Sequence, residues 1–366
     1  MPAHRGARRP LGDRPDRSRV HRSRLRRRRR SRAQGRPGSA AVTVRFAVVG
    51  CGTAANHIHL PGLRAAGAAV TAFASRSRAS AEVTRDQWGS GTVVDHWEDA
   101  VTRDDVDAVV VATPNVLHCD VAVAAARAGK HVIVDKPMAR TVVEADEMIA
   151  AAAATGVVLV PFQNARFVAP FAAARAVVAE GRLGSVTGVR AAFGHAGPQA
   201  WAPRAAWFFD RSQAGGGCLI DLGVHIVDVI RHVAADDIVE VAAFLNGPAG
   251  GVELDAQLLV RLGGGAIGSV HASWTSRPGP DQQLTVVGTQ GTLHLDTHTP
   301  LTFLPLEGER ERVALPETTG SPLEELLAAM RGDRQPTVTA EDGRAAVAVV
   351  EAAYHAAADG CTAAVA

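Results

Sequence analysis

The sequence is poor in lysine, tyrosine and cysteine. Of its 366 residues, two are lysine (Lys130 and Lys136), one is tyrosine (Tyr354) and four are cysteine. The cysteines are scattered and form no CxxC pair, which argues against a zinc site or a disulfide framework and favours a reducing, cytoplasmic location. A composition of 47% hydrophobic and 21% charged residues also excludes wholesale disorder and collagen-like repeats.

The sequence also lacks an unbroken apolar run long enough for a membrane span. Residues 148–165 carry no charge, but Gly156 and Pro161 interrupt them. Their pattern changes from alanine-rich to valine-rich, which predicts a helix end, a glycine turn and a buried strand. We therefore expect no membrane segment.

The formal net charge of +2 averages two unlike segments. Residues 1–40 hold fifteen arginines against Asp13 and Asp16, a net charge of +13, whereas the remainder is acidic, at −11. Such a segment repels itself and has little apolar periodicity, so we expect residues 1–41 to be a disordered tail. The favoured interpretation is translated upstream GC-rich DNA with a natural start near Val42. A transit peptide or a nucleic-acid-binding arm is the alternative.

The length predicts two domains, because single cores rarely exceed about 250–300 residues. Up to Pro161, strands alternate with helices, as in a parallel α/β sheet. Between residues 186 and 304, strands mostly follow strands, which favours an antiparallel sheet. We expect a first domain over residues 42–161 and a second over 162–366, with a C-terminal helix over 341–359 that packs back near the first domain.

A glycine-rich motif follows the first expected strand, residues 44–49. It reads G-x-G-x-x-A and consists of Gly50, Cys51, Gly52, Thr53, Ala54 and Ala55. The first glycine permits a tight turn, the second lets backbone approach a pyrophosphate, and the small Ala55 lets the next helix pack closely. The N–H groups that begin this helix favour phosphate. The motif predicts a dinucleotide-binding unit.

The second expected strand, residues 70–74, ends without an acidic residue. An NAD site commonly places a carboxylate there for the ribose 2′-hydroxyl, but this chain has Ser75 followed by Arg76, Ser77 and Arg78. Ser75 and Arg76 are suited to hydrogen-bond and pair with a 2′-phosphate. The sequence therefore favours NADP over NAD. The alternative is that Arg76 and Arg78 are solvated loop cations.

Two further expected strands, residues 108–112 and 131–134, end in polar clusters. These clusters are Thr113, Pro114 and Asn115 with the nearby His118, and Asp135, Lys136 and Pro137. Ligands of parallel α/β sheets bind beyond the carboxyl ends of the strands, so we expect both clusters to line the cofactor site. Lys136 is informative in an arginine-rich chain, because a buried lysine can lose its proton and a guanidinium cannot.

In the second half, three glycines at 215–217 precede an apolar helix that carries Asp221, His225 and Asp228. Asp221 and His225 are spaced i,i+4 and share a face, and Asp228 is placed to orient the imidazole. The alternative is a capping aspartate with a buried histidine that it satisfies. We expect no metal, because the first half offers no third ligand at metal spacing among His57, His59 and His118.

Taken in order, these motifs resemble the glucose–fructose oxidoreductase / inositol dehydrogenase / MocA (Gfo/Idh/MocA) family of NAD(P)-dependent oxidoreductases. The resemblance runs from about Val44 to the C-terminus and includes the turn at 287–293 and the helix start at 341–343. It implies a Rossmann dinucleotide-binding domain and an open-faced, mostly antiparallel β-sheet domain with flanking helices. It also implies a sugar- or polyol-like substrate in the cleft, and a homo-oligomer, dimer or tetramer, formed through the outer sheet face.

The resemblance maps the catalytic lysine to Lys136 and the acid and histidine of the second domain to Asp221 and His225. His225 suits removal of the proton from a carbinol oxygen, and Lys136 suits stabilisation of the developing alkoxide. Asn164 and Arg166 are expected to line the substrate side. Trp201 and Trp207 either stack on a sugar or belong to the core, and Tyr354 lies too near the C-terminus to serve as proton donor.

Other functions remain open from the sequence. Similar scaffolds use bound NAD for glycoside hydrolysis without net redox change, and a non-catalytic nucleotide sensor is a further alternative. The presence of Lys136, Asp221 and His225 argues against a sensor. Nucleic-acid binding would rest on the arginine-rich tail alone and is not expected.

Overall fold

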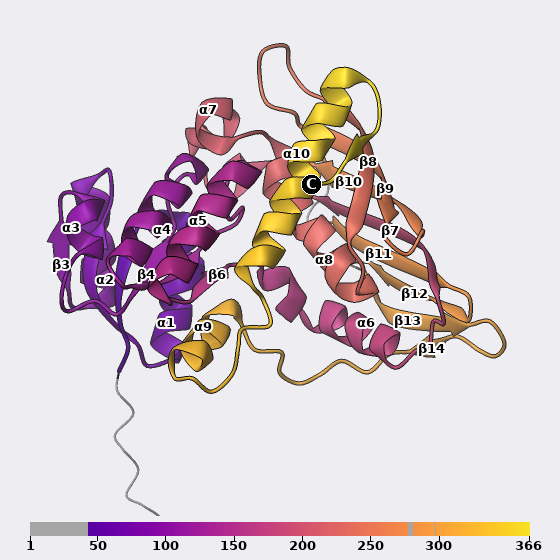
Figure 1. Ribbon diagram of the computed structural model, residues 1–366, viewed down its shortest axis with the longest axis horizontal. Coiled ribbons are helices and arrows are strands. Elements are labelled where there is room, and N and C mark those ends of the chain that lie inside the picture. The colour runs from indigo at the N-terminus through magenta and orange to yellow at the C-terminus, as the bar shows by residue number, and fades with distance from the viewer. Residues whose placement is uncertain (1–42, 277–280, 297) are drawn as a thin grey trace, which may run out of the picture. The chain divides into compact units, whose positions relative to one another are not determined.

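The computed structural model describes residues 43–276, 281–296 and 298–366, and residues 43–366 belong to one unit. The tail expected over residues 1–41 lies outside the described residues. Two sheets dominate the fold (Figure 1). Among the described helices, none combines the length and apolar character needed to cross a bilayer.

The first sheet has six strands in the order β3-β2-β1-β4-β5-β6, and every pair is parallel. The strands are β1 (Arg45–Val49), β2 (Ala69–Ala74), β3 (Thr92–Val94), β4 (Ala108–Val111), β5 (His131–Val134) and β6 (Leu159–Pro161). Central strands such as β4 are buried on both faces, which explains their continuous valine runs. This confirms the Rossmann-like sheet, although the short and more exposed β3 was not expected.

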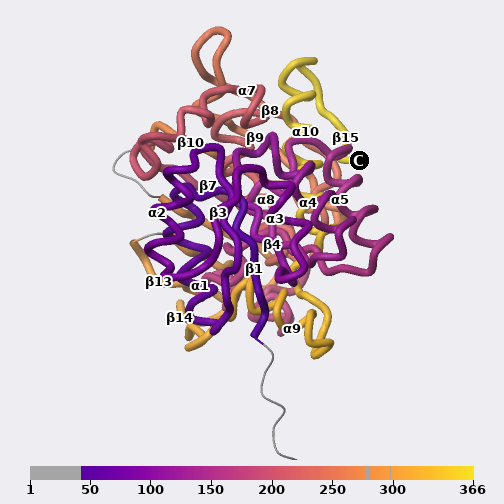
Figure 2. The backbone as a smooth tube through the Cα atoms, turned by 90° about the vertical axis from the view of Figure 1, so that its left-hand side faces the viewer, coloured from indigo at the N-terminus to yellow at the C-terminus, as the bar shows by residue number. Residues whose placement is uncertain are grey.

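Helices cover both faces of this sheet. Side chains of α3 (Trp97–Val101), α4 (His118–Arg127) and α5 (Val142–Thr155) form one core. Side chains of α1 (Leu60–Ala65) and α2 (Arg78–Trp88) form the other, together with α9 (Pro322–Met330) from near the end of the chain. Figure 2 shows this half of the molecule facing the viewer. The participation of α9 in the first core was not expected.

The second sheet has nine strands in the order β14-β13-β12-β11-β7-β10-β9-β8-β15, and only the β7–β10 pair is parallel, which confirms a mostly antiparallel sheet. Its strands are β7 (Val186–Gly194), β8 (Ile238–Asn246), β9 (Asp255–Leu262), β10 (Ile267–Ser273), β11 (Asp281–Gly288), β12 (Gly291–Asp296), β13 (Thr299–Pro305), β14 (Glu311–Arg312) and β15 (Ala363–Ala364). In β9, buried and exposed residues alternate strictly, so one face packs inward and the other is open.

The inner face packs on α6 (Ala169–Ala179), α8 (Val224–Ala234) and α10 (Ala340–Asp359). Helix α10 begins at a capping box formed by Thr339 and Asp342. It contacts α5 and β6 on one side and α8 and β8 on the other, so it joins the two sheets (Figure 1). Shorter turns of helix are α7 (Arg211–Ala214), η1 (Ala55–His59), η2 (Asn115–Leu117), η3 (Asn164–Phe167), η4 (Pro198–Ala200), η5 (Ala206–Phe209) and η6 (Leu219–Gly223).

Candidate active site

The glycine-rich turn after β1 forms an open backbone cradle. Gly50 has a φ of +97°, and a Cβ atom there would lie 2.2 Å from the carbonyl oxygen of Ala112, so only glycine fits. A Cβ atom on Gly52 would meet no heavy atom within 4 Å, which leaves space beside the exposed backbone. Asn56 closes the turn by donating its amide to the carbonyl oxygens of Cys51 and Gly52, and Ala55 is fully buried behind it.

The end of β2 presents a serine and one unengaged arginine. Ser75 is half-buried and Arg76 is exposed. Arg78 pairs with Glu82 and Asp95, and the hydroxyl of Ser77 accepts the N–H of Ser80 and caps α2. Within the described part of the chain, Arg76 forms no ion pair, so its guanidinium is available to an anion.

The turn after β4 is anchored from several sides. The Asn115 amide donates to the carbonyl oxygen of Ala214 at 2.8 Å, which ties this turn to the end of α7. His118 is only 1% exposed, and its Nδ1 and Nε2 lie 2.8 Å and 3.0 Å from the carbonyl oxygens of Pro137 and Thr113. Burial lowers the pKa of His118. Both side chains therefore support the turn, and among these residues only the Thr113 hydroxyl is a buried polar group without a partner.

Lys136 and Asp221 are 85 residues apart in the sequence, and their side chains meet at the centre of the site. The Lys136 Nζ donates to Asp221 Oδ1 at 2.5 Å and to the Asp221 carbonyl oxygen at 2.9 Å. Trp274 Nε1 donates to Asp221 Oδ2 at 2.9 Å, and His195 Nε2 lies 3.8 Å from the same oxygen. Burial alone would raise the pKa of Asp221, but the Lys136 charge and these donors hold it well below its ordinary range.

His225 lies one helical turn after Asp221 and is half-buried. Its Nδ1 is buried without a hydrogen-bond partner, and its ring centroid is 6.0 Å from that of Phe193. Burial and the nearby positive charge of Lys136 lower the pKa of His225 to about 3. The imidazole is therefore neutral at pH 7.

Two expectations about the neighbourhood of His225 are wrong. Asp228 does not orient the imidazole, because its carboxylate accepts Arg166 Nε at 2.8 Å and Arg166 Nη2 at 2.6 Å. Arg166 does not present its guanidinium to a substrate, because it is buried between Asp228 and Asp342. These three side chains form a structural ion network that joins η3, α8 and α10. Asn164, at the start of η3, is half-buried.

Several site residues were missed from the sequence. His195 and Trp274 sit in unremarkable positions after β7 and β10, and only the fold brings them to Asp221. Gln163, two residues after the end of β6, is fully buried with both amide atoms unpartnered, and β6 pairs with β5, which ends two residues before Lys136. Its place at the end of the apolar run 157–162 was the one available signal. Trp207 stacks on Phe208 at 3.9 Å and Trp201 meets the same ring edge-on, so both belong to an aromatic cluster that extends to Trp274.

A metal is not indicated by the described side chains. Across residues 43–276, 281–296 and 298–366, no three histidine, cysteine, aspartate or glutamate side chains are grouped to hold one. The residues at the carboxyl edge of the first sheet instead fit a dinucleotide. The open cradle at Gly52 and the orphaned polar groups of Thr113 and Gln163 are the features that a phosphate and an amide-bearing ring would use.

Comparison with known proteins identifies both halves. Residues 44–162 match the model of an oxidoreductase family with an NAD-binding Rossmann fold, and residues 171–294 match the Gfo/Idh/MocA C-terminal domain. The 1,5-anhydro-D-fructose reductase of Ensifer adhaerens is 34% identical over 86% of this chain and 97% of its own length. The myo-inositol 2-dehydrogenase of Thermotoga maritima is 27% identical over 66% of this chain and 75% of its own length.

Solved structures agree. The aldose-aldose oxidoreductase from Caulobacter crescentus superposes with a TM-score of 0.78 at 26% identity, covering 88% of this chain and 99% of that one. GenD2 from gentamicin A biosynthesis, solved with NAD, gives a TM-score of 0.77 at 29% identity, covering 90% and 98%. The chain therefore belongs to the Gfo/Idh/MocA family of NAD-binding oxidoreductases.

Proposed function

We propose that the protein transfers a hydride between NADP(H) and a CH–OH or C=O group of a sugar-like compound. The observation that carries this proposal is the Lys136–Asp221 pair with His195 and Trp274 around it. It sets a cation, an acid and further hydrogen-bonding groups beside the carboxyl edge of the dinucleotide-binding sheet. The Ensifer adhaerens relative, which is aligned over 86% of the chain, is named a 1,5-anhydro-D-fructose reductase, and this name supports a cyclic keto-sugar as substrate.

The cofactor preference rests on Ser75 and Arg76. The Gly50–Ala55 turn would hold the pyrophosphate, and Arg76 would pair with a 2′-phosphate, since no carboxylate follows β2 to repel one. The unpartnered amide of Gln163 and hydroxyl of Thr113 would receive the carboxamide of the nicotinamide. Asn115, His118 and Asp135 would support the turns that contact the cofactor.

The chain's own residues handle the proton. The bound nicotinamide supplies or accepts the hydride. In reduction, the Lys136 ammonium donates a hydrogen bond and then a proton to the substrate oxygen, while Asp221 holds that ammonium in place. His225 is neutral at pH 7, so it accepts a hydrogen bond from a substrate hydroxyl. His195 accepts the N–H of Gly197 at Nδ1, which leaves its Nε2–H to face Asp221 and the substrate.

A substrate screen tests this function. 1,5-Anhydro-D-fructose, aldoses, polyols and inositols are offered with NADPH, NADP, NADH and NAD in parallel, and absorbance of the reduced nicotinamide is recorded. We expect turnover of a keto-sugar with NADPH. Conversion of a glycoside with no change in absorbance would instead show hydrolysis with bound cofactor, and cofactor binding without any conversion would show a sensor.

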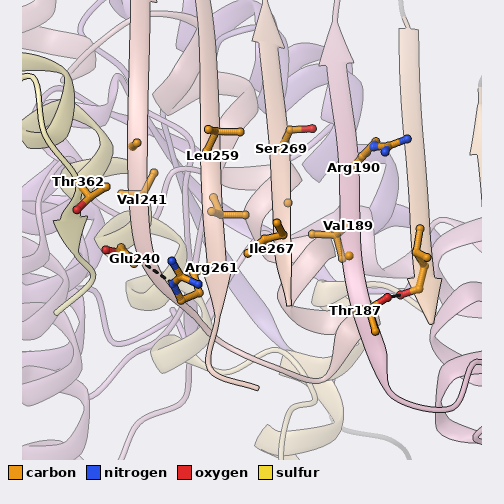
Figure 3. Close-up of a pocket in the computed structure, with 15 residues that line it drawn as sticks. Thr187, Val189, Arg190, Glu240, Val241, Leu259, Arg261, Ile267, Ser269 and Thr362 are labelled. Atoms are coloured by element: carbon orange, nitrogen blue, oxygen red, sulfur yellow. Dashed lines mark hydrogen bonds and ion pairs between the residues drawn. The ribbon is translucent and has the colours of Figure 1, made fainter. Parts of the chain in front are cut away.

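We also propose that the open face of the second sheet binds a second copy of the chain. Figure 3 shows this face around a shallow depression of about 590 Å³, lined by Arg190, Glu240, Leu259, Arg261 and Ile267 among others. Leu259 and Ile267 are 65% and 61% exposed on neighbouring strands, beside the Glu240–Arg261 pair. Apolar side chains flanked by charges of both signs suit a self-complementary interface.

Light scattering after gel filtration tests this interface. We expect a dimer or tetramer for the wild-type chain and a monomer for the double variant Leu259→Glu/Ile267→Glu. A monomeric wild-type protein at about 10 µM, well above the dissociation constant expected for a standard-size interface, would contradict the proposal.

A further inference from the structure

The glycine turn before η6 is held by a carboxylate from a distant part of the chain. Glu253, in the connection between β8 and β9, is 4% exposed, and its Oε1 accepts the backbone N–H groups of Gly217 at 2.7 Å and Leu219 at 3.1 Å. The first N–H groups of a helix have no partner within the helix. Glu253 therefore caps this helical segment from 34 residues away.

The only tyrosine of the chain completes this cap. Tyr354 Oη donates to the same Glu253 Oε1 at 2.8 Å, and Arg211 Nη2 lies 3.3 Å from Oε2. Burial and the charge of Glu253 raise the pKa of Tyr354 well above its ordinary value, so the phenol stays a donor throughout the working pH range. One carboxylate thus receives four donors from three separate segments.

The three-glycine turn is shaped to admit these groups. A Cβ atom on Gly216 would lie 1.8 Å from Tyr354 Oη, and one on Gly217 would lie 2.0 Å from the carbonyl oxygen of Glu253. Larger residues at either position would expel the tyrosine or the glutamate. Gly216 and Gly217 are therefore explained by the cap, without any direct approach of a ligand.

The capped segment bears Asp221, and the same connection also holds Trp274. The N–H of Asp221 donates to the carbonyl oxygen of Gly217, and that of Cys218 to the carbonyl oxygen of Glu253. The N–H of Trp274 donates to the carbonyl oxygen of Leu254. Residues 253–254 consequently hold two side chains in place. One is the Asp221 carboxylate, which accepts the hydrogen bond of Lys136, and the other is the Trp274 indole, which donates to that carboxylate.

We propose that Glu253 and Tyr354 are positioning residues, which set the placement of Asp221 against Lys136 without contacting the substrate. The proposal rests on the proposed function for its kinetic consequence. Loss of the cap leaves buried N–H groups unpaired, and the turn then shifts to find other partners. Asp221 moves with it, and its hold on the Lys136 ammonium weakens.

The test compares Glu253→Met, which removes the acceptor, with Glu253→Gln, whose amide oxygen can still accept the N–H groups. In Glu253→Met we expect kcat for the keto-sugar found in the screen to fall on the order of 30-fold, as for two lost hydrogen bonds. We also expect the apparent pKa of the acid limb of its pH profile to rise. The dissociation constant of NADPH, measured by fluorescence, should change less than about twofold, because the cofactor turns are untouched. Glu253→Gln should restore kcat to within about fivefold of wild type.

A purely structural role gives another pattern, with a lower melting temperature and an unchanged kcat and pH profile in Glu253→Met. That result overturns the proposal. Should Glu253→Met fail to fold, Tyr354→Phe decides, because it keeps the carboxylate and removes one donor. We expect it to lower kcat about three- to fivefold and to move the acid limb in the same direction. Wild-type kinetics for Tyr354→Phe overturn the joint role.

Amide hydrogen exchange separates this proposal from the proposed function. If wild-type protein turns over no sugar, the proposed function fails, yet the cap is still testable in the folded variants. We expect the amides of Gly217, Leu219 and Asp221 to exchange at least about tenfold faster in Tyr354→Phe or Glu253→Met than in wild type. Unchanged exchange at these amides overturns the proposal whatever the activity.

Discussion

Lys136 and Lys130 are the two lysines of the chain, and they lie in different surroundings. Lys136 pairs with Asp221, whereas Lys130 Nζ donates to the carbonyl oxygens of Arg103 and Val106 at the amino-terminal ends of the strands. We expect Lys136→Ala and His225→Ala each to lower kcat at least about 100-fold, because each removes a group that donates a proton or a hydrogen-bonding site to the reacting substrate. Lys130→Ala is the matched control and should leave kcat unchanged. Wild-type turnover in Lys136→Ala would refute its assigned role.

The two arginines after β2 allow a similar contrast for the cofactor. Arg76 has no acidic partner among the described residues, whereas Arg78 is held by Glu82 and Asp95. Arg76→Glu should raise the dissociation constant of NADPH on the order of tenfold or more and leave that of NADH nearly unchanged, as expected for a contact to the 2′-phosphate. Arg78→Ala should affect both cofactors little. Equal effects of Arg76→Glu on NADPH and NADH would show that Arg76 is a solvated cation.

At this scale the sequence predicted some neighbours and not others. The family resemblance assigned Lys136 and Asp221 to one site, and their side chains lie in contact in the structure. The motifs could not show that Arg166 forms an ion pair with Asp228, which lies 62 residues further along the chain. The sequence around a polar side chain does not reveal a partner that lies far away in the chain. His195 and Trp274 were missed for this reason.

The glycine-rich turn separates folding from cofactor binding within one element. Gly52→Ala places its methyl group in open space, so the melting temperature should stay within about 2 °C of wild type while NADPH binding weakens at least about tenfold. Gly50→Ala forces a left-handed backbone and a contact with Ala112, so it should lower the melting temperature by several degrees. Thermal unfolding and fluorescence titration measure the two effects. Unimpaired binding in Gly52→Ala would contradict the assigned cradle.

The ion network of Arg166, Asp228 and Asp342 connects three helical elements. Arg166→Met leaves the buried carboxylate of Asp228 without its cation and the half-buried Asp342 with Arg231 alone, so we expect a loss of about 3–5 kcal/mol in the free energy of unfolding. Because the guanidinium does not reach a substrate here, KM for the sugar should change little in protein that remains folded. Urea unfolding and steady-state kinetics measure both. A large rise in KM with unchanged stability would restore the substrate-binding role expected from the sequence.

Among whole elements, apolar runs predicted strands well because buried parallel strands are continuously hydrophobic. β1, β2, β4, β5 and β6 were found in this way. β3 was not, since its three residues are half-buried or exposed and carry no comparable signal. The π-helical turns η1 and η6, which follow the two glycine motifs, were expected as ordinary helix. Glu253 contacts the start of η6 from a distant part of the chain, which the local sequence does not reveal.

For the molecule as a whole, two half-buried histidines predict how stability depends on pH. Burial and neighbouring cations lower the pKa of His225 to about 3 and that of His232 to about 4, from an ordinary value of 6.5. The unfolded chain therefore binds more protons between pH 6.5 and 3, so the free energy of unfolding falls as pH falls through this range. Urea midpoints at pH 7 and pH 5 should reveal the loss, and His232→Gln should reduce it by on the order of 1–2 kcal/mol. A flat profile in the wild type would contradict the burial of these rings.

The packing of α9 on the first sheet has a consequence for synthesis. Leu323, Leu326 and Leu327 belong to the same core as Phe46 and Val48, almost 280 residues earlier in the chain. The first half of the protein leaves the ribosome first. The core of its sheet is completed by the leucines of α9 only when nearly the whole chain has been made. At typical elongation rates of about 5–20 residues per second, that interval lasts roughly 15–60 seconds. During this time one face of the nascent sheet is only partly covered and depends on chaperones or its own helices to avoid association.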